Sequence, residues 1–166
     1  MSTVQQDTRH RGVLIAALWI ATSSSGLSLA VSPEAVRSKT SLEDVMKYEN
    51  PDVVERIEKE LGVTPQQAKA LFDDLKRFLW LAAVTPPTTV PTPQIDEAWH
   101  RFVLYTKDYA DFCNIYFGGF LHHAPQRLGE KRLEHADLFE TIDAMHREFG
   151  GIPSDNWHYA REEYAG

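Results

Sequence analysis

A chain of 166 residues with 43% hydrophobic and 11% aromatic residues is long and apolar enough to bury the core of one domain, which excludes wholesale disorder. Its 17 Lys and Arg residues against 24 Asp and Glu residues give a net charge of -7, which argues against DNA or RNA as a partner. The one cysteine, Cys113, excludes an internal disulfide and a cysteine-rich zinc site.

The first thirty residues differ in composition from the rest. A polar start with two arginines precedes an apolar run over residues 13–21, and small residues follow at positions 28–30. This order is typical of a secretory signal peptide, and a retained N-terminal helix is the alternative. We therefore divide the chain into a signal peptide or N-terminal helix over 1–30 and a domain over 31–166, located in the cytoplasm or exported. The serines and the glycine in this stretch argue against a stable membrane span.

Helix-start signals follow from residue 41 onward. Ser41 predicts the start of a short helix that ends near Tyr48. Asn50 followed by Pro51 is an N-cap and first-turn pair, and it predicts a helix that ends before Gly62.

A longer helix is predicted from Thr64, which stands three residues before Gln67 at the spacing of a capping box. Its apolar residues recur at helical spacing and form one broad face: Ala68, Leu71, Phe72, Leu75, Phe78, Leu79 and Ala82. Residues 85–93 contain four prolines and predict a stiff extended connector, because proline interrupts a helix.

Thr92 and Pro93 then predict a helix that continues to about Phe117 and ends at two glycines. A loop over residues 121–125 leads to a further helix over about 131–149, and residues 155–164 predict a last short one. No alternating pattern indicates a strand. The predicted fold is all-α, a single compact domain of about four to six helices with a proline-rich connector.

One group of residues could hold a metal ion. Asp96 and His100 are four positions apart, so their side chains share one face of the predicted helix. His122 and His123 follow in the loop, where one of them could fold back to that face. Two imidazoles and one carboxylate suit zinc or iron, and two adjacent histidines cannot easily bind one ion together. This group supports an alternative function, that of a divalent-metal-binding domain with the chemistry of a small hydrolase or oxygenase.

The main prediction gives the same residues a structural role in a helical module that binds another protein or a small ligand. His100 lies beside Trp99 and could hydrogen-bond to a carboxylate, while Pro125 sets the turn of a loop locked to the helix. Tyr109 and Cys113 fall on the buried face of the same helix, where a free cysteine is usually a small hydrophobic residue. No nucleophile turn or nucleotide-binding loop is present.

Several motifs resemble those of the glycine-rich domain-containing protein-like family, a helical domain of bacterial and plant proteins. The resemblance is carried by Ile-Asp-Glu-Ala-Trp-His at 95–100, Tyr-Thr-Lys-Asp-Tyr at 105–109 and Leu-His-His-Ala-Pro at 121–125. It covers about residues 50–160 and implies a helical domain whose activity is largely unassigned. Family members usually read Trp-His-x-His, and Phe102 replaces the second histidine here. If that histidine is a ligand in relatives, the resemblance implies that this chain has lost it.

Overall fold

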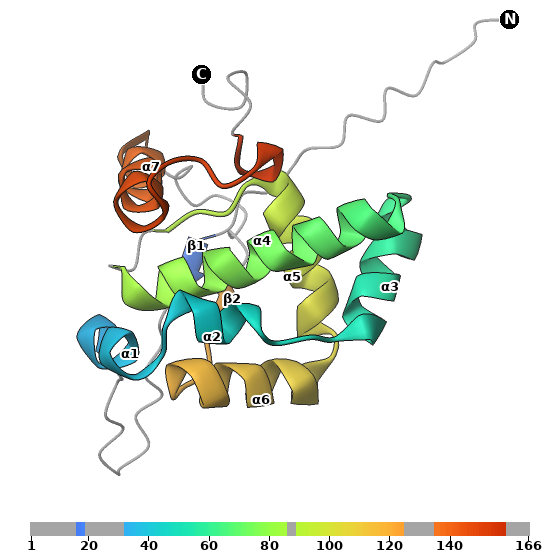
Figure 1. Cartoon of the computed structure of the whole chain (residues 1–166), viewed down its shortest axis with the longest axis horizontal. Coiled ribbons are helices and arrows are strands. Elements are labelled where there is room, and N and C mark those ends of the chain that lie inside the picture. Colours follow the sequence, from blue (N-terminus) through green and yellow to red (C-terminus); the bar gives the residue numbers. More distant parts are fainter. Residues whose placement is uncertain (1–15, 19–31, 86–88, 125–134, 159–166) are drawn as a thin grey trace, which may run out of the picture.

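The computed structural model describes residues 16–18, 32–85, 89–124 and 135–158. The elements, in chain order, are β1 (Ala16–Leu18), α1 (Pro33–Lys39), α2 (Leu42–Met46), α3 (Pro51–Leu61), α4 (Pro65–Val84), α5 (Pro93–Val103), α6 (Thr106–Phe117), β2 (His122–Ala124), α7 (His135–Phe149) and a short 3-10 helix, η1 (Asp155–Trp157) (Figure 1). The all-α prediction is confirmed. The described part of the chain holds seven α-helices, slightly more than the four to six expected.

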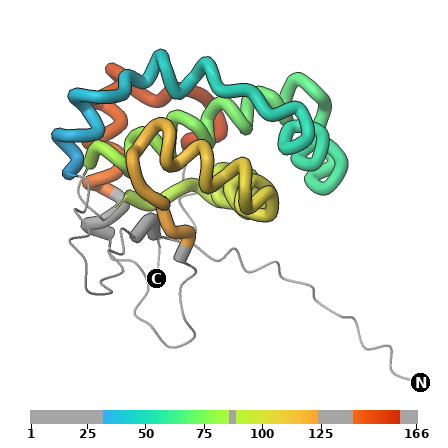
Figure 2. The backbone as a smooth tube through the Cα atoms, turned by 90° about the horizontal axis from the view of Figure 1, so that it is seen from below, coloured from blue at the N-terminus to red at the C-terminus, as the bar shows by residue number. Residues whose placement is uncertain are grey.

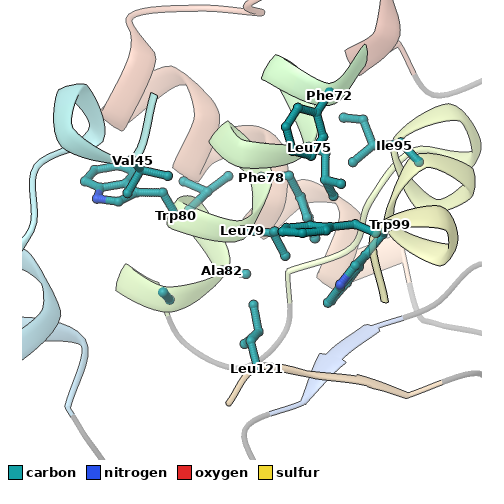
Figure 3. Close-up of a cluster of buried hydrophobic side chains, with 14 of the residues drawn as sticks. Val45, Phe72, Leu75, Phe78, Leu79, Trp80, Ala82, Ile95, Trp99 and Leu121 are labelled. Atoms are coloured by element: carbon teal, nitrogen blue, oxygen red, sulfur yellow. The ribbon is translucent and has the colours of Figure 1, made fainter. Parts of the chain in front are cut away.

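Helix α4 is the centre of the fold. Figure 1 shows it crossing the middle of the molecule, with α7 above it and α2 and α6 below. It contacts α1, α2, α3, α5, α7 and η1. Its residues Leu75, Phe78 and Leu79 are fully buried in the core (Figure 3). The hydrophobic core of the described residues is therefore arranged around this one helix.

The predicted helix starts are confirmed at four helices. The side chains of Ser41, Asn50, Thr64 and Thr92 each accept a hydrogen bond from a backbone N–H in the first turn of α2, α3, α4 and α5. Thr64 and Gln67 complete the capping box, since each side chain accepts from the other's backbone. Gly62 ends α3 with a φ of 65°, a left-handed conformation that glycine adopts without steric cost.

The single helix predicted up to about Phe117 is wrong. Helix α5 ends at Val103, Leu104 caps it with helical backbone angles, and the backbone leaves helical geometry at Tyr105, so α5 and α6 are two helices. Neither residue is a proline or a glycine, and the sequence therefore carries no local signal for the break.

Packing between the two helices accounts for this break. In one straight helix, Trp99 and Tyr109 would lie about 15 Å apart along the axis. In the structure, Trp99 Nε1 lies 3.0 Å from the hydroxyl of Tyr109, and the rings of Phe102 and Tyr109 are 5.1 Å apart. The break thus folds the apolar faces of α5 and α6 onto each other, and the buried area outweighs the helix hydrogen bonds lost at the turn.

The first and the last α-helix of the described residues, α1 and α7, lie at the same end of the molecule. Figure 2 places α3 at one end and α1 and α7 at the other. There the guanidinium of Arg37 donates two hydrogen bonds of 2.7 Å to the carboxylate of Glu148, which joins α1 to α7. Such a two-point arginine–carboxylate contact fixes the relative orientation of both helices.

The structure also contains two strands that the sequence does not predict. β1 and β2 pair antiparallel, with Ala17 opposite His123. Each strand has three residues, too few for an alternating pattern to be visible in the sequence. Some of the predictions fall outside the described residues. They concern the rest of the N-terminal segment, Pro125, and residues 131–134 and 159–164 of the two last predicted helices.

No helix in the described part of the chain is both long and apolar enough to cross a membrane.

Candidate metal centre

Asp96 lies in the first turn of α5, which Thr92 caps. Its side chain is only 3% exposed. A buried carboxylate is costly unless positive charge or hydrogen-bond donors compensate it, and the start of a helix supplies part of that compensation. The fold thus holds one carboxyl group at the edge of the core.

His100 follows one helical turn later, as the spacing predicts. Its Nδ1 lies 3.8 Å from Asp96 Oδ2, too far for a hydrogen bond, and its side chain is 41% exposed. His100 therefore forms the solvent side of the site, while Asp96 forms the buried side.

His123 completes the cluster from β2. Its Nε2 lies 3.0 Å from Asp96 Oδ1, and its side chain is 7% exposed. The imidazole meets the ring of Trp99 edge-on at 4.3 Å between centroids and lies 4.5 Å from the ring of His100. His123 is thus fixed by one polar and one aromatic contact.

His122 does not join the cluster. Successive side chains of a strand point to opposite faces, so only one of two neighbouring histidines can face Asp96. The ring of His122 instead packs on Phe120 at 4.8 Å. The sequence could not distinguish His122 from His123, because that choice depends on a strand that only the tertiary fold creates.

The three side chains have the spacing that one ion needs. Each of Asp96, His100 and His123 offers a ligand atom, and these atoms lie within 4.8 Å of one another. With bonds of about 2.1 Å, neighbouring ligand atoms are about 3.0 Å apart in octahedral and about 3.4 Å apart in tetrahedral coordination. The Asp96 carboxylate lies at comparable distances from both imidazoles, 3.0 Å from Oδ1 to His123 Nε2 and 3.8 Å from Oδ2 to His100 Nδ1. One ion bound by a single oxygen of Asp96 would therefore require these side chains to rotate.

Residues of α6 support the segment that carries His123. The Tyr109 hydroxyl accepts a hydrogen bond from Trp99 and donates one of 2.6 Å to the backbone oxygen of Leu121. Burial raises the pKa of Tyr109 well above its usual value and the pKa of the Cys113 thiol to about 11. Both groups therefore stay protonated at neutral pH. The sequence indicated that Tyr109 is buried, but it gave no signal for the hydrogen bond to Leu121.

Phe102, which stands where relatives usually have the second histidine of Trp-His-x-His, does not lie at the cluster. Phe102 is fully buried and packs against Phe72, Tyr109 and Phe112. Positions 100 and 102 point in nearly opposite directions on a helix. The presence of Phe102 therefore removes no ligand from the cluster of Asp96, His100 and His123.

The fold and the cluster define a small all-α domain with a histidine and aspartate site at the edge of its core. A family model described as UCP032817-like matches residues 41–144, and the chain belongs to this family. Comparison with curated proteins and with solved structures gives no match. The family match includes Asp96, His100 and His123 but carries no assigned activity.

Proposed function

We propose that the protein is a divalent-metal-binding domain whose ligands are Asp96, His100 and His123. The observation that carries this proposal is the convergence of three ligand atoms, within 4.8 Å of one another, from two separate elements of the fold. Residues 96 and 123 are far apart in the sequence, so helical spacing alone does not bring them together.

The donor set favours zinc or iron(II). Two imidazole nitrogens and one carboxylate oxygen occur in catalytic zinc sites and in open iron(II) sites, both of which leave positions for water or substrate. The burial of the ligands is uneven, since Asp96 and His123 are nearly covered and His100 is partly exposed. We propose that the open positions face solvent beside His100.

The chemistry of such a site would be that of a hydrolase or an oxygenase. A metal ion with an open position can activate water or bind a substrate oxygen. Choosing between these activities requires the identity of the metal first. The likeness to glycine-rich domain-containing proteins remains an interpretation, because the family match supports only an uncharacterised family.

A helical binding module, in which these residues lock β2 to α5, is the second candidate. Its specific support is the contact of 3.0 Å between His123 Nε2 and Asp96 Oδ1, which satisfies both groups without an ion when the nitrogen carries the proton. Metal binding through Nε2 requires that proton to leave, so the hydrogen bond and the ion exclude each other at this nitrogen.

The test is elemental analysis of the full-length protein together with titration by Zn²⁺ and Fe²⁺. We expect about one equivalent of metal in the wild type. The variants His123→Ala and Asp96→Asn should lose it, because each removes a buried ligand, and His100→Ala should weaken binding. His122→Ala is the matched control, since it changes the adjacent histidine, whose ring packs on Phe120.

Two results would overturn the proposal. One is well-folded wild-type protein that takes up neither ion. The other is equal loss of metal in His122→Ala and His123→Ala, which would place the ion somewhere other than the cluster. In the first case, the binding module becomes the better account.

A further inference from the structure

A chain of two hydrogen bonds connects α5, α6 and the start of β2. Trp99 Nε1 donates to the Tyr109 hydroxyl over 3.0 Å, and this hydroxyl donates to the Leu121 backbone oxygen over 2.6 Å. An indole nitrogen can only donate and a carbonyl oxygen can only accept, so the hydroxyl proton of Tyr109 must point to Leu121. The donor and acceptor of both hydrogen bonds are thus fixed by the groups that form them.

The two residues at the ends of this pair of hydrogen bonds both affect the position of His123. Leu121 is two residues before His123, so holding its carbonyl group fixes where β2 begins. Trp99, which starts the chain, also presents its ring to the imidazole of His123 at an angle of 88°. Figure 3 shows Trp99 and Leu121 at the edge of the core nearest to β2. The Tyr109 hydroxyl therefore links the Leu121 backbone, which leads into His123, to the Trp99 ring, which packs against the His123 imidazole.

Burial makes this linkage persistent. Trp99, Tyr109 and Leu121 are fully buried, so water does not compete for their hydrogen bonds. Burial also raises the pKa of Tyr109 well above its usual value, so the hydroxyl that donates to Leu121 keeps its proton at neutral pH. The thiol of Cys113, one turn further along α6, interacts with Tyr109 and with the backbone of Leu121 as well.

We infer that Tyr109 is a positioning residue for the metal centre: its hydroxyl sets the place of His123 relative to Asp96. This inference rests on the proposed function. The Tyr109 hydroxyl acts on a ligand rather than on the ion, through Leu121 and Trp99. Groups that orient a metal ligand in this way typically change metal affinity by about 10–100-fold when they are removed.

The experiment compares Co²⁺ binding by full-length wild type and Tyr109→Phe. This change removes the hydroxyl and keeps the ring that packs on Phe102 and Phe120. We expect a dissociation constant for Co²⁺ about 10–100-fold higher and a shifted visible absorption spectrum, because the ligand geometry changes. Tyr105→Phe is the matched control: its hydroxyl also donates to a backbone oxygen, that of Asp52 at 3.0 Å, away from the cluster. It should leave affinity and spectrum unchanged.

A second readout needs no metal. The ring ¹⁵N chemical shifts of His123 report which nitrogen carries the proton, and they therefore respond to the contact between His123 Nε2 and Asp96 Oδ1. We expect these shifts to move in metal-free Tyr109→Phe and to stay in Tyr105→Phe. If Tyr109→Phe does not fold, fluorotyrosine at position 109 keeps the hydroxyl and alters its acidity. The same shifts of His123 should then move.

The possible results separate the two claims. Wild type that binds no Co²⁺, while the His123 shifts move in Tyr109→Phe, contradicts the metal site and keeps the positioning role. Wild type that binds Co²⁺, with the same affinity, spectrum and His123 shifts in Tyr109→Phe, overturns the positioning role and keeps the metal site. Equal effects of Tyr109→Phe and Tyr105→Phe also overturn it, since the cause would then be general destabilisation.

Discussion

Cys113 shows how strongly the interior of this domain disfavours charge. The thiol is fully buried on α6, and burial raises its pKa from 9.0 to about 11. The folded protein therefore holds the thiol proton more tightly than the unfolded chain does. The stability linked to this proton is fully present below about pH 9 and is lost as the pH rises toward 11.

This linkage predicts the behaviour of Cys113→Ala. The difference in free energy of unfolding between wild type and variant should be constant from pH 7 to about 8.5. It should then shift by about 2–3 kcal/mol in favour of the variant as the pH approaches 11. Urea denaturation at a series of pH values measures it. A difference that does not depend on pH would contradict the burial of a protonated thiol.

At the same scale, the candidate site was predictable in part. The spacing of Asp96 and His100 predicts that they share a helix face, and the structure brings them together. The choice of His123 over His122 was not predictable, because it depends on the face of a three-residue strand. Spacing within one element can be inferred from the sequence, whereas contacts between elements require the packing of the whole chain.

Among the elements, the helix starts carry the strongest local signals. Thr64 accepts a hydrogen bond from the backbone of Gln67, and the side chain of Gln67 accepts one from the backbone of Thr64. We predict that Thr64→Ala lowers the free energy of unfolding by about 1 kcal/mol, because the backbone N–H of Gln67 at the start of α4 loses its side-chain acceptor. Thermal or urea denaturation provides the measurement.

Thr106→Ala is the control for this prediction. Thr106 is exposed at the start of α6, where no side chain caps the helix. Its replacement should change stability by less than about 0.5 kcal/mol. If the two variants are equally stable, the capping box contributes nothing to the central helix.

The break between α5 and α6 shows the limit of local signals. Caps at Asn50, Thr64 and Thr92 are properties of a few adjacent residues, so the sequence predicts them correctly. The turn at Tyr105 has no such signal, and it forms because Trp99 and Tyr109 gain a buried contact across it. A single helix would satisfy the local pattern, but it would leave those aromatic faces without partners.

For the whole molecule, one buried carboxylate ties the end of the described chain to its centre. Asp74 of α4 is 1% exposed. It accepts hydrogen bonds from Arg77, from Ser154 over 2.6 Å and from Asn156 over 2.8 Å. These contacts hold η1, and with it Trp157, against the central helix.

We predict that Asp74→Ala lowers the free energy of unfolding by about 2–4 kcal/mol, since it leaves partly buried donors without the buried carboxylate that accepts from them. Amide hydrogen exchange should also become faster over residues 154–157. Asp155→Ala is the control, because that side chain is fully exposed and should change stability by less than about 0.5 kcal/mol. Unchanged exchange in Asp74→Ala would show that the apolar contacts of Trp157 alone hold the segment.

The most direct test of the central claim is the metal content of three full-length proteins purified in parallel: wild type, His123→Ala and His122→Ala. The proposed site predicts about one equivalent of zinc or iron in wild type and in His122→Ala, and none in His123→Ala. Folded wild-type protein without metal after incubation with both ions, or equal metal content in the two variants, would contradict it.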